Sequence, residues 1–418
     1  MKKKILAVLV CMTMLLSMTG CGRDEITLAE EEDIVEISFS WWGTDPRHDY
    51  TMEAVKKFEE MHPNIQVHME YSEWTGYDRK NAVVMASNTE ADVMQINFSW
   101  LNKYSPDGSR YYDLESLSDL DLTTFSSDIL DYGRSNGVLN ALPIALNSKV
   151  FLYNEELYES FGLSVPETWD DFYKAAQKMS VKGIYPLDLD STAAFMTSVA
   201  YVEQSTGKPF FDSNNKLNFG QEEVRTMLEF YLGLVENKVV EYMGERNDSS
   251  YKEGIYAGTV QWITNAEKYQ KNLFEGLEQT TVIGKVPMLS GATTTGWYAK
   301  PASMYVISSN TKHPKEAAML LDYLVNSEEM AVLQGMEKGV PVSTSAKSAL
   351  ETAGMMTGIQ TEAQTVIDNT QTKIMSPNYE DSGLQTAFKD ALDSILYNNA
   401  DVETEAVKAY AAMKNALK

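Results

Sequence analysis

Residues 34–71 decide the fold class and read IVEISFSWWGTDPRHDYTMEAVKKFEEMHPNIQVHMEY. The segment from Ile34 to Ser40 is rich in β-branched and apolar residues, which predicts a strand. Residues 51–61 place apolar side chains at helical spacing, and Pro63 ends the predicted helix. From Ile65 to Tyr71 apolar and polar residues alternate, which indicates a second, half-buried strand. The segment therefore predicts a strand, a helix and a strand in succession.

The same order continues along the chain. Residues 76–87 predict the next helix and residues 91–96 the next strand. Strands joined through helices are parallel, and their crossovers are right-handed, so this region predicts a doubly wound α/β sheet. In such sheets ligands bind beyond the carboxyl ends of the strands.

Tryptophans gather at these strand ends. Trp41 and Trp42 follow the first strand, Trp74 the second and Trp100 the third, which accounts for four of the seven tryptophans. A flat ring with one polar N–H suits a sugar, because the C–H face of the sugar stacks on it. We expect these four rings to be stacking platforms, with Asp45, Arg47 and Asn97 as partners for sugar hydroxyls. The alternative is that the rings are core residues, since tryptophan is highly buried on average.

Later residues predict a second set of elements. Asn136-Gly137 is typical of a hairpin turn, and Thr168 begins a helix as its cap, with Asp171 in the capping-box position. Trp262 ends a predicted strand and so repeats the earlier pattern. The predicted strands cover 150–154, 258–262, 281–289 and 304–307, the helices cover 168–179, 192–204 and 221–237, and the chain beyond His313 is largely helical.

The first 21 residues are typical of an export signal. Lysines 2–4 precede the apolar run from Ile5 to Leu16, which is shorter than the ~20 residues of a membrane span. The sequence Met18-Thr19-Gly20-Cys21 resembles the bacterial lipobox, in which the cysteine is acylated and becomes the first mature residue. We therefore expect residues 1–20 to be a signal peptide and 21–33 to be a lipidated acidic tether. An ordinary cleaved signal is the alternative.

Cysteine content and charge exclude several classes of protein. Removal of the signal takes Cys11 with it and leaves Cys21 alone, so the mature chain has neither a disulfide framework nor a cysteine metal cluster. The net charge of −25 becomes −28 without the three lysines, which disfavours binding to nucleic acid or anionic lipid. The 398 residues that remain of 418 exceed what a single core usually holds, so two lobes are expected.

Short motifs in a fixed order give the chain a resemblance to a known family. They are Phe39-Ser40-Trp41-Trp42-Gly43, Phe58-Glu59, Pro63-Asn64-Ile65, Ala91-Asp92-Val93-Met94-Gln95, Tyr153-Asn154, Pro166-Glu167-Thr168-Trp169, Ala257-Gly258, Trp262, Lys300-Pro301, Lys312-His313-Pro314-Lys315-Glu316-Ala317-Ala318 and Lys338-Gly339-Val340-Pro341-Val342. From Ile34 onward the chain resembles the maltose-binding-like family, the bacterial extracellular solute-binding proteins of carbohydrate ABC importers. Some details look closest to the branch that contains pectic-oligosaccharide binders.

The resemblance implies a two-lobed, periplasmic-binding-protein-like α/β fold. Each lobe would be a mostly parallel sheet flanked by helices, and strands crossing near 144–147, 285–289 and 339–343 would join the lobes. Lobe 1 would comprise 34–143 with a return segment 289–338. Lobe 2 would comprise 144–288 with the C-terminal segment 339–418.

The function implied by the resemblance is capture of an oligosaccharide between the lobes and its delivery to ABC permease subunits. On the second lobe and the return strands we expect Asn147, Trp262, Trp297 and Lys300 to contact the ligand; Tyr77, Tyr298 and His48 are weaker candidates. No cofactor or metal is implied. The protein is expected to be a monomer, held at the extracytoplasmic side of the cell membrane through acylated Cys21. Because Arg47 and Lys300 are the only basic residues among these candidates, we expect a neutral sugar.

Two other functions fit the sequence. A surface-anchored glycoside-active enzyme is one, because paired carboxylates cannot be recognised among so many acids. Gly133-Arg134-Ser135-Asn136-Gly137 matches the nucleophile-elbow pattern of hydrolases, but its Asn-Gly pair favours a turn. A peptide, polyamine or metal-complex receptor with the same fold is the other, and the tryptophan cluster argues against it.

Overall fold

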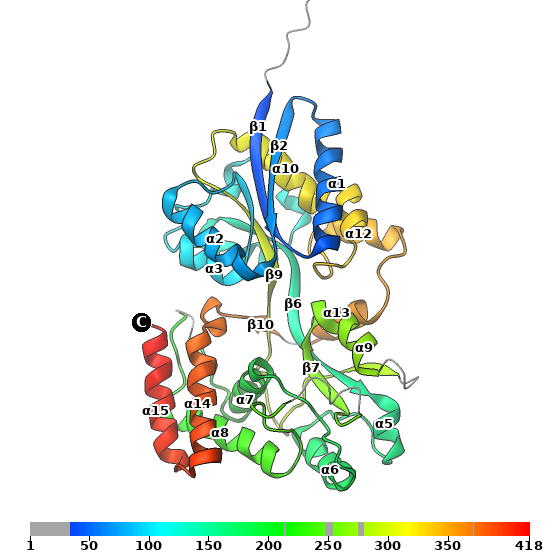
Figure 1. The fold of residues 1–418 in the computed structure, drawn as a ribbon, viewed down its shortest axis with the longest axis vertical. Coiled ribbons are helices and arrows are strands. Elements are labelled where there is room, and N and C mark those ends of the chain that lie inside the picture. The colour runs from blue at the N-terminus through cyan, green and yellow to red at the C-terminus, as the bar shows by residue number, and fades with distance from the viewer. Residues whose placement is uncertain (1–33, 213–214, 247–253, 275–279, 371) are drawn as a thin grey trace, which may run out of the picture. The chain divides into compact units, whose positions relative to one another are not determined.

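The computed structural model describes residues 34–418, apart from 213–214, 247–253, 275–279 and 371 (Figure 1). The predicted signal and tether, with Cys21, lie outside the described residues. Within the described part, no helix is long and apolar enough to cross a membrane. The strands are β1 (Val35–Trp42), β2 (Ile65–Ser72), β3 (Val93–Ile96), β4 (Arg134–Ser135), β5 (Val138–Leu139), β6 (Ala141–Asn154), β7 (Gly258–Trp262), β8 (Thr281–Gly284), β9 (Tyr298–Ile307) and β10 (Lys373–Ile374).

Helices connect and cover these strands. The α-helices are α1 (Asp45–Met61), α2 (Trp74–Ser87), α3 (Phe98–Tyr104), α4 (Ser127–Asp131), α5 (Glu155–Ser160), α6 (Trp169–Met179), α7 (Ser191–Thr206), α8 (Gln221–Glu236), α9 (Ala266–Phe274), α10 (Pro314–Asn326), α11 (Glu328–Gln334), α12 (Thr344–Thr352), α13 (Ile359–Asp368), α14 (Ser382–Asn398) and α15 (Val402–Ala416). Short 3₁₀ turns cover Leu114–Ser116, Leu122–Thr124, Ser180–Lys182, Ile263–Asn265 and Pro377–Glu380.

The main sheet is mixed. Its strands are ordered β2-β1-β3-β9-β6-β7, with β8 paired to β6 and β10 to β9. The β1 strand pairs in parallel with β2 and β3, as the sequence predicts, whereas β9 runs antiparallel to β3 and β6. The strands β7 and β8 are also antiparallel to β6. The expected parallel arrangement thus holds for β1 with β2 and β3 and for β10 with β9, whereas the pairs that β6 forms with β7, β8 and β9 and the β3–β9 pair are antiparallel.

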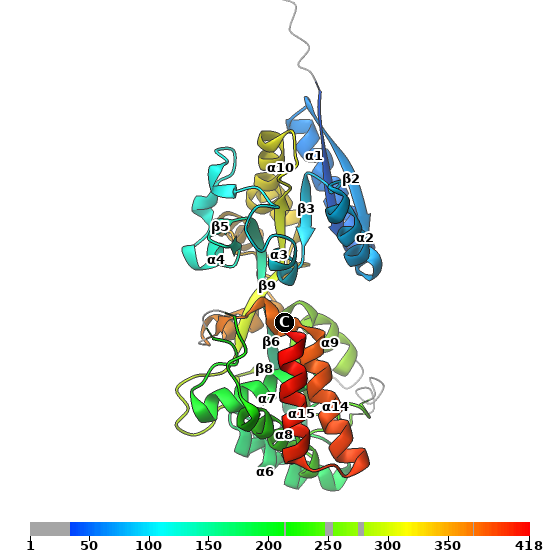
Figure 2. The same ribbon diagram turned by 90° about the vertical axis from the view of Figure 1, so that its left-hand side faces the viewer.

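The buried side chains form two large groups. One group covers both faces of the β2-β1-β3-β9 part of the sheet, with α1 and α10 on one face and α3 on the other. The other group surrounds β6 and β7 and includes residues from α6, α7, α8, α14 and α15. Figures 1 and 2 show the strands β6 and β9 continuing from the first group of elements into the second. We call these the first and second cores.

The segments that link the two cores differ in part from those expected. Two links lie where crossings between the lobes were expected: residues 144–147 are part of β6, and Pro341 forms a β-bridge to Ala145. The third link runs through β9, whereas Val286 packs in the second core, so Lys285 to Leu289 is no crossing. The expected return segment 289–338 begins in the second core, where Trp297 packs. Leu350, expected in the second lobe, packs against Ala331 of α11.

Two glycines hold the buried ring of Tyr153 on β6. A Cβ atom at Gly284 of β8 would lie 2.2 Å from Cε2 of this ring, and a Cβ at Gly258 of β7 would lie 2.6 Å from Cδ1. Because Tyr153 is fully buried, the ring has no free space to move into.

We therefore expect Gly284→Ala to lower the free energy of unfolding by about 1–3 kcal/mol through overpacking. Gly233→Ala on α8 is the matched control, because its Cβ would meet only the Tyr173 hydroxyl at 3.3 Å. Helix propensity predicts that this control is neutral or stabilising by up to about 1 kcal/mol. Urea unfolding of both variants measures the difference, and equal stabilities would contradict the packing described.

Candidate functional site

The first tryptophan pair lies inside strand β1, which extends two residues beyond the predicted end. Side chains alternate along a strand, so Trp41 and Phe39 pack on the α1 and α10 face of the first core, and Trp42 packs on the opposite, α3 face. Trp41 is fully buried, stacks on Phe39 and Tyr71 at 4.9 and 5.0 Å, and donates its Nε1–H to His48 Nδ1 at 3.2 Å. A ring without exposed surface cannot stack on a sugar, so Trp41 belongs to the core.

The remaining tryptophans of this region form one cluster. Trp42 lies 5.1 Å from Trp74 and 5.9 Å from Trp100, measured between ring centroids. Trp74 and Trp100 stack at 5.4 Å, and Tyr77 packs against Trp42 at 5.3 Å. Trp74 is 45% exposed, whereas Trp42 and Trp100 are each 7% exposed. Trp74 therefore offers the open face, and the other rings support it.

The predicted hydroxyl partners differ in how available they are. Asp45 is exposed in the first turn of α1, which begins earlier than predicted. Arg47, in the same turn, donates from Nη2 to the Glu337 carbonyl oxygen at 2.7 Å. Asn97 caps α3, since its Oδ1 accepts from the Ser99 backbone N–H at 2.9 Å. The side-chain carbonyl of Asn97 is therefore already engaged in a hydrogen bond within the protein.

A cavity of about 70 Å³ lies where β1, β3, β6 and β9 meet. Asn147, Trp42 and Arg47, all predicted as site residues, line it together. Four further polar residues were not predicted: Gln95, Thr264, Ser303 and Lys338. Gln95 lies in β3, one residue before its end, and the strand position was the only sequence signal for it. The complete lining is Trp42, Arg47, Gln95, Asn147, Thr264, Ala302, Ser303 and Lys338.

Trp262 lies at the end of β7, as predicted, and remains partly exposed. The Nζ atoms of Lys300 and Lys149 lie 4.9 and 5.5 Å from the centre of its ring. Lys300 pairs with the carboxylate of Glu380. Both cations lie close to the ring, and its partial exposure makes Trp262 the aromatic candidate of the second core.

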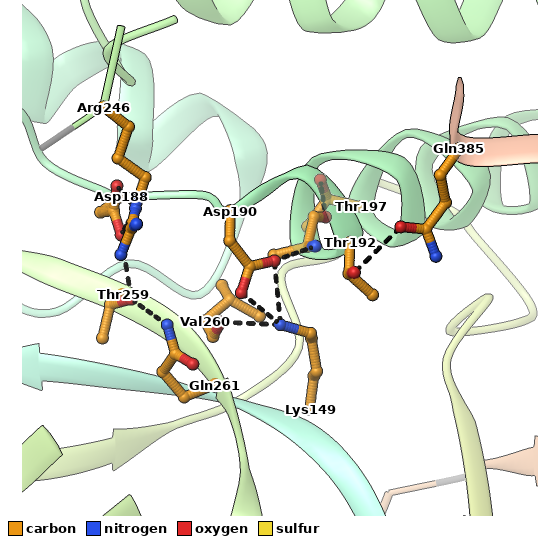
Figure 3. A network of polar contacts seen from close by, with 11 residues as sticks. Lys149, Asp188, Asp190, Thr192, Thr197, Arg246, Thr259, Val260, Gln261 and Gln385 are labelled. Carbon is orange, nitrogen blue, oxygen red and sulfur yellow. Dashed lines mark hydrogen bonds and ion pairs between the residues drawn. The ribbon is translucent and has the colours of Figure 1, made fainter. Parts of the chain in front are cut away.

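A polar network holds the Lys149 side chain in place (Figure 3). Lys149 Nζ lies 3.1 and 3.0 Å from the two carboxylate oxygens of Asp190 and donates to the Val260 carbonyl at 3.3 Å. Asp190 also caps α7 by accepting from the Ala193 N–H at 2.7 Å. Burial lowers the pKa of Lys149, and the adjacent Asp190 opposes this shift. The network therefore links α7, β6 and β7 behind Trp262.

Trp297 does not reach this site. Its ring is fully buried in the second core, and Nε1 donates to the Lys149 carbonyl oxygen at 2.7 Å. Trp297 thus holds β9 against β6 and is a packing residue.

Tyr298 lines a second cavity, of about 350 Å³. Its other lining residues are Phe98, Leu101, Asn102, Asp131, Tyr132, Arg134, Pro209, Phe211, Asp212, Asn215, Lys373, Ile374, Met375, Ser376 and Pro377.

Two observations bear on the catalytic and metal alternatives. The Gly133–Gly137 segment lies in the β4–β5 hairpin, where Asn136 and Gly137 have φ of 49° and 85°. That is the predicted turn and not a strand followed by a helix. In the part of the chain that the structure describes, no three His, Cys, Asp or Glu side chains are grouped to hold a metal ion.

Comparison with known proteins identifies the family. The model of the bacterial extracellular solute-binding proteins matches residues 44–331. The chain belongs to this family. One relative of this solute-binding protein is the arabinooligosaccharide-binding protein of Bacillus subtilis (strain 168), which is 22% identical over 250 residues. That match spans 57% of this chain and only 56% of the relative.

Solved structures share the fold over nearly the whole chain. A periplasmic oligogalacturonide-binding protein from Yersinia enterocolitica, in complex with saturated digalacturonic acid, is 31% identical with a TM-score of 0.80. The similarity covers 92% of this solute-binding protein and 100% of that chain. A de novo designed cysteine esterase has a TM-score of 0.85 at 31% identity, covering 93% and 100%. The esterase activity is a designed one, so this likeness concerns the fold.

Proposed function

We propose that this solute-binding protein captures an oligosaccharide beside Trp42, Trp74 and Trp262 and delivers it to the permease of an ABC importer. The observation that carries the proposal is the cavity in which side chains from β1, β3, β6 and β9 converge. A few placed polar groups beside aromatic rings are typical of sugar sites. Family membership and the names of the oligosaccharide-binding relatives support the same function.

Capture works through the two cores as the halves of one receptor. A ligand that contacts Trp42 and Trp262 together has more contacts in a closed arrangement than in an open one, so it favours the closed arrangement. The permease then recognises the closed form. The strands β6 and β9 serve as the hinge, because both belong to the two cores.

The location proposed follows from the sequence. Acylation of Cys21 anchors the protein to the membrane, residues 22–33 act as an acidic tether, and the folded part works as a monomer on the extracytoplasmic side. Binding alone, without catalysis, suffices for this role.

The test is a binding screen with the mature protein. Calorimetric titration with plant and host oligosaccharides should give saturable binding of at least one, and chromatography after prolonged incubation should recover that sugar uncut. Cleavage of the bound sugar would favour the glycoside-active enzyme. Stabilisation against heat by peptides, polyamines or metal complexes, and by no sugar, would favour the non-sugar receptor.

A further inference from the structure

Lys338 is the one buried lysine of the described residues without a carboxylate partner. Three lysines are buried there, namely Lys149, Lys300 and Lys338. The first pairs with Asp190 and the second with Glu380. Lys338 Nζ instead donates to the Tyr305 hydroxyl at 2.7 Å, and lies 5.0 and 5.9 Å from the ring centres of Tyr305 and Tyr50. A buried cation without a counter-ion is costly.

A second cation faces the same cavity. Arg47 lines it together with Lys338, and Arg47 donates from Nη2 to the backbone carbonyl of Glu337, a neutral acceptor. The eight residues of the lining include no aspartate or glutamate. Burial lowers the pKa of Lys338 well below its usual value, and the nearby charge of Arg47 lowers it further. An anion in the cavity would offset both charges.

The same cavity contains two unused acceptors. Gln95 is 1% exposed and Asn147 is 7% exposed, yet neither Gln95 Oε1 nor Asn147 Oδ1 has a hydrogen-bond partner. Buried polar atoms almost always have a hydrogen-bond partner, so these two oxygens are available to accept hydrogen bonds from a ligand. Sugar hydroxyls are such donors. The lining is therefore complementary to a ligand that carries an anionic group and hydroxyls within a few ångströms of each other.

We propose that the ligand is an acidic oligosaccharide and that Lys338 and Arg47 bind the carboxylate of one uronate residue. Hydroxyls of the same sugar donate to Gln95 and Asn147. The volume of about 70 Å³ fits this assignment, since one water needs roughly 10–15 Å³ of such space. The cavity therefore accommodates a carboxylate, while the sugar ring extends toward Trp42. This inference rests on the proposed function and replaces the neutral sugar expected from sequence.

The test compares each acidic oligosaccharide with its own carboxyl-reduced form. Oligogalacturonates, alginate oligosaccharides and glucuronate-containing oligosaccharides are titrated calorimetrically into the wild-type protein, beside their reduced, neutral counterparts. We expect at least one acidic form to bind roughly thirtyfold or more tightly than its reduced form, as for loss of one member of a buried charge pair. Equal affinities of the two forms would overturn the inference and leave the proposed receptor function standing.

Variants assign the effect to the cavity. Lys338→Met should remove most of the difference between the acidic and reduced sugars, and Arg47→Met should reduce it. Lys80→Met, at an exposed lysine paired with Glu70, is the matched control and should leave the difference unchanged. A difference that persists in a folded Lys338→Met variant would overturn the assignment. The wild-type comparison remains valid even if that variant does not fold. Binding of neither form would overturn the inference, and the proposed function would fall only if the wider panel of oligosaccharides also failed to bind.

Discussion

Replacement of Trp262 by alanine is expected to weaken oligosaccharide binding roughly ten- to hundredfold. The side chain ends β7 and keeps a partly exposed ring, which Lys300 and Lys149 hold in place from 4.9 and 5.5 Å. Burying a large aromatic side chain contributes about 1.5–3 kcal/mol, and about 1.4 kcal/mol corresponds to tenfold in affinity. Calorimetric titration of the variant with the sugar that the wild type binds measures the loss.

Two control variants isolate the role of the ring. Trp262→Phe retains an aromatic face and should lose less affinity than Trp262→Ala. Tyr397→Ala removes an aromatic ring that is 56% exposed on α14 and is expected to bind as the wild type does. Full affinity in Trp262→Ala, with unchanged thermal unfolding, would remove Trp262 from the site.

Replacement of Arg246 by leucine is expected to lower the free energy of unfolding by roughly 3 kcal/mol or more. Arg246 Nε lies 2.8 Å from both carboxylate oxygens of Asp188, which is 2% exposed. Removing one member of a buried ion pair leaves the other charge in a poorly solvating interior. Asp188 Oδ2 also accepts a hydrogen bond from the Thr259 hydroxyl of β7 at 3.4 Å, so the loss also weakens the support of β7. Urea unfolding at neutral pH measures the change.

The pH dependence tests the cause of this loss. Burial raises the pKa of Asp188 to about 6, above the ordinary value of 3.8. The folded state therefore favours the protonated form, and the cost of the charged form is full above about pH 6 and fades as the pH falls toward 3.8. Arg246→Leu should regain stability between about pH 7 and pH 5, and Asp188→Asn/Arg246→Leu should be more stable than Arg246→Leu at neutral pH. A pH-independent deficit in Arg246→Leu would show that Asp188 is not its origin.

Local patterns in the sequence predicted much of the fold. The β1-α1-β2-α2-β3 order follows from hydrophobic periodicity, and the structure confirms it. Thr168 and Asp171 form the predicted capping box, since Thr168 accepts from the Asp171 N–H and Asp171 accepts from that of Thr168. Trp169 is 2% exposed beside this cap and packs in the second core. These features depend on a few neighbouring residues and can therefore be predicted from a single sequence.

Features that depend on strand ends and distant pairing were harder to predict. The sequence did not reveal that β1 continues through Trp42, and this extension sends Trp41 into the core. Tryptophan is a residue type that suits a sugar site, but the pairing of β9 with β6 buries Trp297. Lys338 lies far along the chain from Gln95, and only the folded sheet brings them to one cavity. A buried lysine among polar residues has no local sequence signal.

We expect an oligosaccharide to bind between the Trp42 side and the Trp262 side of this solute-binding protein. The most direct measurement is calorimetric titration of the wild type and of Trp42→Ala/Trp262→Ala with the same panel of acidic and neutral oligosaccharides. We predict saturable binding of at least one sugar by the wild type and a loss of roughly a hundredfold or more in the folded double variant. Failure of the wild type to bind any sugar would contradict the receptor function, and undiminished binding by the double variant would contradict binding between Trp42 and Trp262.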